Sequence, residues 1–366
     1  MKFLYRSSFL FIFSFLMCHC NSNDTSDQEK KGEDNKQIVD LALIYQGGVK
    51  RLDWNKEQIA PHVSWVNPET NKEEWLFDGF LFIEFRDFQG HIFATGYGDA
   101  PAPKHIWTWL LERVFEKNLA VDALNQVVGE TISRVGEPKR KHKVVLTLPE
   151  PIYGFKGWGE LNGKKLDFEI AEDRIAATKW FVDELIVRWE KENFKNLELA
   201  GFYWVAEETD EKVTPVIQQT AQYISEKGKE FYWIPWWNSP GSNKWADLGF
   251  NVAWQQPNHF FNTSVPDSRL SQACEFALAR NMGMEIEWDE KLWTDSDNYI
   301  PRLQAYMNTF EHFKVADTVS MAHYMGWGGL YDFKREKEGN DRLTKLYNRY
   351  CTMISSRQIN GINNKD

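Results

Sequence analysis

From residue 38 onward, the chain alternates short apolar segments with longer segments whose apolar residues recur at helical spacing. This alternation is typical of a parallel sheet in which helices connect successive strands. Eight apolar segments are expected to be strands, at 39–45, 79–85, 144–148, 197–206, 230–235, 251–255, 283–288 and 318–323. Helices are expected at 104–135, 170–193, 210–227, 268–280, 298–313 and 341–357.

Eight strands, with a helix after nearly every one, predict a fold of the α/β class: a single (β/α)8 barrel, or TIM barrel. We expect this barrel over 38–358, followed by a tail at 359–366. The second strand is expected to return as a hairpin through 92–95, and Asn162-Gly163 predicts another hairpin within an insertion at 153–168. The main alternative is a doubly wound open sheet, which the lack of a glycine-rich phosphate loop after the first strand disfavours.

The N-terminus has the pattern of a bacterial lipoprotein. Two basic residues and an apolar run at 9–17 precede Cys18 and Cys20, and a polar, charged stretch follows. We expect a lipoprotein signal peptide at 1–20, lipidation at Cys20, and a flexible polar tether at 21–37. The protein would then be exported and anchored to a membrane of the cell envelope, periplasmic or at the cell surface. Simple cleavage and secretion is the alternative.

Composition limits the partners. The formal net charge of −10 argues against nucleic acid, whose phosphates require a basic surface. The 8 histidines lack ligand spacing, and neither a Gly-x-Ser-x-Gly elbow nor a P-loop is present, so we expect no metal and no cofactor. Cys274 and Cys351 lie in expected helices, and we expect both to be buried free thiols.

Acidic residues occur at the carboxyl ends of two expected strands, which is where barrels of this kind have their active sites. The fourth strand ends in Gly201-Phe202-Tyr203-Trp204-Val205-Ala206-Glu207-Glu208, and the seventh reads Met284-Glu285-Ile286-Glu287-Trp288-Asp289. Side chains alternate between the two faces of a strand. If Met284 and Ile286 face the helices, Glu285 and Glu287 point into the barrel, where acids are costly unless paired or used.

These residues carry a resemblance. The positions of Glu207 and Glu287 are similar to those of the acid/base and the nucleophile in a superfamily of retaining TIM-barrel glycosidases, although Ala206 replaces the usual Asn. The Gly-Phe-Tyr-Trp-x-x-Glu and Glu-x-Glu-x-Asp segments also resemble an uncharacterised bacterial family, the domain of unknown function numbered 4855. That family implies an exported, glycosidase-like barrel and supplies no substrate.

Structural explanations compete with this one. Glu207 and Glu208 precede Thr209, a plausible N-cap, and could stabilise the dipole of the next helix. The strand-seven pair could form ion pairs with Arg or Lys inside the barrel. Glu84 on the second strand is a third barrel acid or, if the hairpin forms, a solvent-exposed residue.

The 17 Trp and 13 Tyr suit stacking on sugar rings, and several follow strand ends together with amides and an imidazole. The residues expected to bind substrate at this rim are Tyr203, Trp236, Trp237, Trp254, Gln255, Asn258, His259, Trp288, Tyr324 and Trp327.

The sequence therefore favours a glycoside hydrolase acting on a poly- or oligosaccharide. Glu207 would be the general acid/base, Glu287 the nucleophile, and Glu285 an orienting or hydroxyl-binding residue. Carboxyl groups about 5 Å apart would mean retention, and roughly 6.5 to 9.5 Å inversion. The alternatives are a non-catalytic glycan-binding lipoprotein, or a structural lipoprotein whose aromatic residues are buried and form no cleft.

Overall fold

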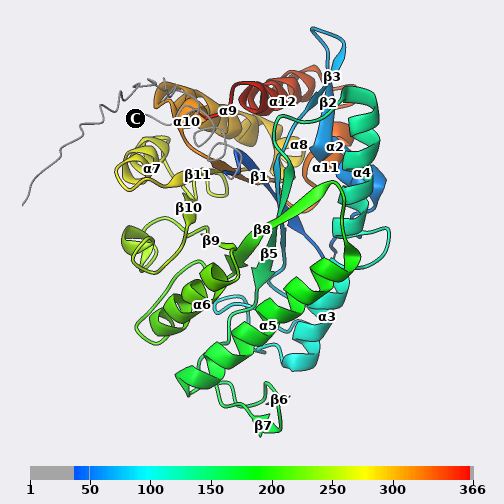
Figure 1. Cartoon of the computed structure of the whole chain (residues 1–366). Helices are drawn as coiled ribbons and strands as arrows, with labels where there is room; N and C mark the ends of the chain where they lie inside the picture. The colour runs from blue at the N-terminus through cyan, green and yellow to red at the C-terminus, as the bar shows by residue number, and fades with distance from the viewer. Residues whose placement is uncertain (1–36, 49, 363–366) are drawn as a thin grey trace, which may run out of the picture. The chain divides into compact units, whose positions relative to one another are not determined.

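The computed structural model describes residues 37–48 and 50–362, so the expected signal peptide, Cys20 and nearly all of the tether lie outside the described residues. Eight parallel strands close into a barrel (Figure 1). They are β1 (Asp40–Tyr45), β4 (Gly79–Ile83), β5 (His142–Leu148), β8 (Leu197–Trp204), β9 (Glu230–Trp233), β10 (Val252–Gln255), β11 (Gly283–Glu287) and β12 (Met321–Tyr324). Because β1 pairs with both β4 and β12, the (β/α)8 prediction is confirmed and the open sheet is ruled out.

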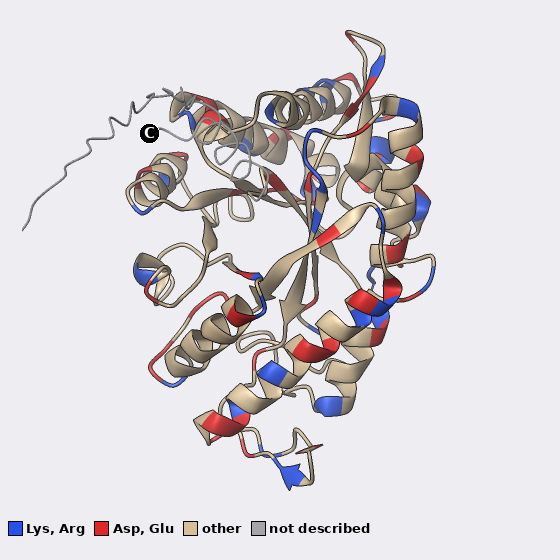
Figure 2. Cartoon of the chain, in the orientation of Figure 1, with Lys and Arg blue, Asp and Glu red and all other residues tan. Residues whose placement is uncertain are grey.

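Helices surround the barrel, and the charged side chains lie mostly on them rather than on the strands (Figure 2). The helices are α2 (Lys56–Val63), α3 (Lys104–Val114), α4 (Ala120–Val135), α5 (Ala171–Glu192), α6 (Thr214–Glu226), α7 (Ser268–Leu278), α8 (Lys291–Thr294), α9 (Ser296–His312), α10 (Val315–Thr318), α11 (Gly329–Glu336) and α12 (Asp341–Asn360). The helical region expected at 104–135 consists of two helices, because Asp122 accepts a hydrogen bond from the backbone N–H of Asn118 and Asn118 is left-handed, with φ of 63°.

Two hairpins lie outside the barrel. Strands β6 (Glu160–Leu161) and β7 (Lys164–Lys165) confirm the Asn162-Gly163 turn, whose two residues both have the positive φ that a type I′ turn needs. The hairpin of β2 (Ser64–Asn67) and β3 (Lys72–Trp75) was not expected from the sequence.

The expected strand at 92–95 is wrong. After β4 the chain does turn back, since the N–H of Phe93 donates to the carbonyl of Phe85, but pairing is limited to one bridge between Arg86 and Ile92. Asp87 accepts hydrogen bonds from the N–H groups of Gln89 and His91, so a turn replaces the ladder.

Inside the barrel, side chains fill the lower layers. The indole of Trp254 lies against Gly283, where an added Cβ would meet the ring at 2.3 Å, so glycine is required there. Trp254 stacks on Tyr232 and donates from Nε1 to the hydroxyl of Ser320. The barrel is therefore closed below, and space is left at the carboxyl ends of the strands.

Two further observations concern the described residues. Cys274 and Cys351 are buried free thiols, as expected. Among the helices of 37–48 and 50–362, none has the length and hydrophobicity that crossing a membrane requires.

Candidate active site

A cavity of about 760 Å³ opens at the carboxyl ends of the strands. Residues at or just beyond the ends of β1, β4, β8, β10, β11 and β12 line it, and Glu207, Glu285 and Glu287 are among them. This is the end at which TIM barrels place their active sites.

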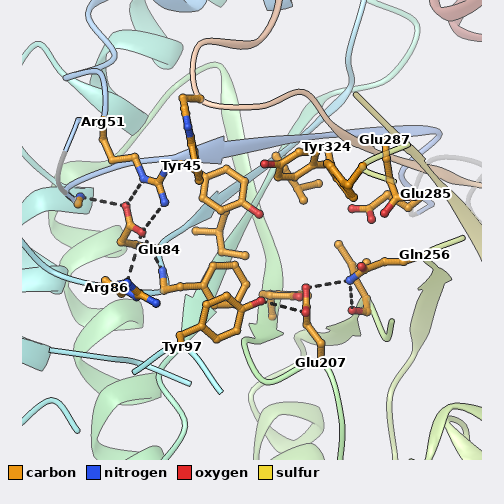
Figure 3. A pocket seen from close by; sticks show the side chains of 18 of the residues that line it. Tyr45, Arg51, Glu84, Arg86, Tyr97, Glu207, Gln256, Glu285, Glu287 and Tyr324 are labelled. Carbon is orange, nitrogen blue, oxygen red and sulfur yellow. Dashed lines mark hydrogen bonds and ion pairs between the residues drawn. The ribbon is translucent and has the colours of Figure 1, made fainter. Parts of the chain in front are cut away.

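Glu207 enters the cavity because it continues the inward face of β8. It lies four residues beyond Tyr203, which also lines the cavity, and side chains of an extended chain alternate faces. The hydroxyl of Tyr97 donates to Oε2 at 2.9 Å, and Nε2 of Gln256 donates to Oε1 at 2.8 Å (Figure 3). Burial raises the pKa of the Glu207 carboxyl and outweighs these two donors, so Glu207 keeps its proton to a higher pH than an exposed glutamate does.

Glu208 behaves differently from Glu207. It is exposed and does not line the cavity. Helix α6 begins at Thr214 with Val213 as its N-cap, so neither glutamate lies in its first turn and Thr209 is not its cap. The helix-dipole explanation is therefore wrong, and the choice between Glu207 and Glu208 falls on Glu207.

Glu287 is held by three donors. The hydroxyl of Tyr306 and the backbone N–H of His259 donate to Oε2, and Nδ2 of Asn258 donates to Oε1 at 3.4 Å. Burial nevertheless raises the pKa of the Glu287 carboxyl, because three neutral donors do not replace bulk water.

Glu285 lies beside Glu287 on the inward face of β11. Burial, followed by the charges of Glu287 and Glu207, raises the pKa of Glu285 well above its ordinary value. Among the described residues, neither Glu285 nor Glu287 forms an ion pair, so the structural explanation by pairing with Arg or Lys is wrong. Because two carboxylates this close repel each other, ionisation of one member of the pair favours a proton on the other.

Two amides connect the carboxyl groups across the cavity. Gln256 donates from Nε2 to Glu207 and accepts from Nδ2 of Asn258 at 2.9 Å, and Asn258 also donates to Glu287. The backbone N–H of Trp237 donates to Oδ1 of Asn258 at 2.6 Å, which fixes the orientation of that amide. Figure 3 shows Glu207 and the Glu285–Glu287 pair facing the same space, with Gln256 between them.

Glu84 is a structural acid. Its carboxylate accepts from Nε and Nη2 of Arg51, at 2.9 and 3.1 Å, and from the N–H groups of Gly48, Phe85 and Arg86. It is fully buried, so the expectation of solvent exposure is wrong. Its pairing with Arg51 ties the loop after β1 to the end of β4.

Aromatic rings cover the wall between these groups. Tyr97 stacks on Phe85 at 4.0 Å between ring centroids, and Phe85 in turn contacts Tyr45. Tyr324 and Trp327 close the cavity on the β12 side, and Trp327 is 43% exposed. Flat apolar surfaces and hydrogen-bonding groups thus meet in one cavity.

Four of the ten residues expected at the substrate rim line the cavity: Tyr203, Asn258, Tyr324 and Trp327. The structure contradicts this placement for the other six. Trp288 is the outward neighbour of Glu287 and packs on Phe333 and Tyr350 of the surrounding helices. Trp254 points inward but lies in the filled layer below the cavity.

The remaining four also lie outside the lining of the cavity. His259 is fully buried and contacts Asp267, so its backbone N–H rather than its imidazole faces Glu287. Gln255 donates to backbone carbonyls. Trp237 packs on Phe276 of α7, and Trp236 is half-buried outside the lining.

The sequence did not identify Tyr97, Gln256, Tyr306 or Arg51. The alternation of side chains could have identified Gln256, because it lies two residues after Trp254 and continues the inward face of β10 just beyond the end of the strand. Tyr97 comes from the irregular loop after β4 and Tyr306 from α9, and no periodicity indicates where such side chains point. Within the described chain, no group of three or more His, Cys, Asp or Glu side chains is arranged to hold a metal ion.

The fold and the cavity define a TIM-barrel protein with three uncompensated carboxyl groups at the carboxyl ends of its strands. The chain belongs to the family described as Domain of unknown function (DUF4855), whose profile matches residues 40–352. No curated protein matches the chain.

Solved structures with similar folds are distant. A mutant tryptophan synthase α-subunit from the hyperthermophile Pyrococcus furiosus is 9% identical, over 87% of this chain and 98% of that one, with a TM-score of 0.36. A xylanase and α-amylase inhibitor protein from Scadoxus multiflorus is 14% identical, over 84% and 98%, with a TM-score of 0.41. At this similarity neither structure informs the function of the chain.

Proposed function

We propose that this protein is a glycoside hydrolase with two catalytic glutamates. The observation that carries the proposal is the placement of Glu207 and Glu287 in one cavity at the active end of the barrel, without a cationic partner among the described residues. Glycoside hydrolysis needs two carboxyl groups beside the scissile bond, one protonated and one ionised.

The roles follow from the surroundings of each group. Glu207, whose pKa is raised by burial, gives its proton to the glycosidic oxygen as the bond to the anomeric carbon breaks. Glu287, stabilised as a carboxylate by Tyr306, Asn258 and the His259 N–H, attacks the anomeric carbon. A water molecule that gives its proton to Glu207 then attacks the anomeric carbon and breaks its bond to Glu287, which leaves as a carboxylate. Glu285 stays protonated and binds a sugar hydroxyl.

The proposal is tested with Glu207→Gln, Glu287→Gln and the matched control Glu208→Gln, each assayed against plant, algal and host polysaccharides. Loss of general acid or nucleophile should lower kcat by about 10³-fold or more. Glu208→Gln should keep full activity, because Glu208 is exposed outside the cavity. The anomer released first, measured by NMR, distinguishes retention from inversion.

Unchanged turnover in Glu287→Gln would remove Glu287 from the mechanism. Glycan binding by the wild type without hydrolysis would favour the alternative, a non-catalytic glycan-binding protein. Absence of both would overturn a carbohydrate function.

We also propose that the protein is a lipoprotein anchored through Cys20. The support is the apolar run followed by a cysteine and a polar stretch. Labelling of expressed protein with radioactive palmitate should be lost in Cys20→Ala and kept in the control Cys18→Ala. Equal labelling of both variants would contradict the assignment.

A further inference from the structure

The cavity has a basic side opposite its acidic one. Lys50 and Arg51, on the loop after β1, and Arg86, just after β4, line the same cavity as the three glutamates. Figure 3 shows Arg51 and Arg86 on one side of the cavity, and Glu285 and Glu287 on the other. A ligand that fills the cavity therefore contacts cationic side chains on one side and carboxyl groups on the other.

The three cations are not equivalent. Arg51 is neutralised by Glu84, and its guanidinium lies over the Trp327 ring at 3.6 Å from the centroid. Lys50 and Arg86 are exposed and form no ion pair with any residue that the structure describes. Asp87 also lines this side, but it is engaged by His91 and by the turn that it caps.

Two unpaired cations at a cavity rim are notable in a chain whose net charge is −10. They attract an anion to one end of the cavity, while the Glu287 carboxylate at the other end repels it. Beside that end, Glu84 holds the Arg51 guanidinium, which lies over the Trp327 ring. A cationic group and an apolar ring therefore form one surface there. The distribution of charge thus orients an anionic ligand in one direction.

We propose that the substrate is an acidic saccharide, whose carboxylate or sulfate ester lies between Lys50 and Arg86 while its glycosidic bond lies at Glu207 and Glu287. This inference rests on the proposed function and adds the substrate class. The anionic group forms charge-assisted hydrogen bonds with the two side chains, and the sugar ring stacks beside Tyr97 and Trp327.

The experiment uses the full chain with Glu207→Gln to prevent turnover. Binding is measured by affinity gel electrophoresis in polygalacturonate, alginate, hyaluronan, κ-carrageenan and fucoidan, each beside its carboxyl-reduced or desulfated derivative, and in xylan, galactan and β-glucan. The carboxylate-only and sulfate-only members identify which anion is bound.

Lys50→Ala/Arg86→Ala should weaken binding of an acidic glycan by about tenfold or more at low salt, and by less at 0.5 M NaCl. The matched control is Lys141→Ala/Lys195→Ala, which removes two exposed charges just before β5 and β8, at the opposite end of the barrel, and should not weaken binding.

Three results are distinguishable. Preference for the acidic member, lost in the cavity variant and kept in the control, supports the proposal. Binding of neutral glycans alone overturns the substrate class, and equal binding of an acidic glycan by both double variants overturns the placement of its anionic group at Lys50 and Arg86. Either result leaves the proposed hydrolase function intact. No binding and no hydrolysis of any glycan overturns the proposed function itself.

Discussion

Asp40 at one end of the barrel, and Glu207 and Glu287 at the other, are acids whose pKa values are shifted in opposite directions. At the N-terminal end of β1, Asp40 accepts from His323, Gln358 and Nε of Arg357, the last at 2.9 Å. Although burial opposes it, Arg357 and His323 lower the pKa of the Asp40 carboxyl. At the other end, burial raises the pKa of Glu207 and of Glu287.

The difference lies in the partners. The lower acid has a cation and several donors, so it stabilises the fold as an ion. Glu207 and Glu287 have neutral donors alone among the described residues, and an ionised group in such a site costs free energy. Carboxyl groups with pKa values shifted in this way are candidates for a catalytic role.

The largest expected effect is on stability at the lower end. Arg357→Ala should lower the free energy of unfolding by about 3 to 5 kcal/mol, because it leaves the Asp40 carboxylate buried without its cation. Urea denaturation at pH 7 measures this. Glu285→Gln at the upper end should keep or increase stability, and an equal loss in both variants would contradict the comparison.

The pH dependence of stability should also separate the two ends. Between pH 5 and 8 the unfolded glutamates are ionised, whereas folded Glu285, whose pKa is raised well above its ordinary value, and folded Glu287, whose pKa is raised to about 7, bind protons over more of this range. The folded state then binds more protons, so the free energy of unfolding falls as pH rises.

Removing both groups with Glu285→Gln/Glu287→Gln should flatten this fall, by about 1.4 kcal/mol per pH unit for each extra proton that the folded wild type binds. For Asp40 the sign is reversed: its lowered pKa gives stability above the unfolded value of 3.8, which is lost as pH falls through the folded pKa. Parallel pH curves for the wild type and the double variant would argue that the upper acids are ionised in the folded state.

The variant Tyr97→Phe tests whether Glu207 is the general acid. The Tyr97 hydroxyl lowers the pKa of Glu207 by donating to its carboxylate, so its removal should move the basic limb of the pH–rate profile to higher pH. We expect kcat/KM at the wild-type optimum to fall by about tenfold. The control Tyr203→Phe removes no hydrogen bond to Glu207 and should leave the basic limb of the pH–rate profile unchanged. A shift of the limb in this variant as well would mean that the polarity of the cavity, and not the Tyr97 hydrogen bond, sets the pKa of Glu207.

The smallest expected effect is on glycan binding by Trp327, a partly exposed residue that lines the cavity. Trp327→Ala should weaken glycan binding by about fivefold, or ~1 kcal/mol, and leave stability nearly unchanged, because the ring is 43% exposed. Phe88→Ala is the control, since Phe88 is 53% exposed and lies outside the cavity. Equal binding by the two variants, measured by calorimetry, would exclude Trp327 as a stacking surface.

The sequence by itself determined the barrel, most strand positions and the inward direction of Glu285 and Glu287. Alternating side chains and strands that bury both faces leave a local pattern that can be read along the chain. The same period-two rule places Trp288 on the outward face next to Glu287, so its assignment to the substrate rim came from its aromatic ring and not from its position in the strand.

Only the tertiary structure decided what surrounds each carboxyl group. Tyr97 and Tyr306 reach Glu207 and Glu287 from a loop and a helix distant in sequence, and Arg51 meets Glu84 rather than the glutamates of the cavity. The charge state of an acid depends on burial and on partners brought together by folding, and neither has a local signal in the sequence.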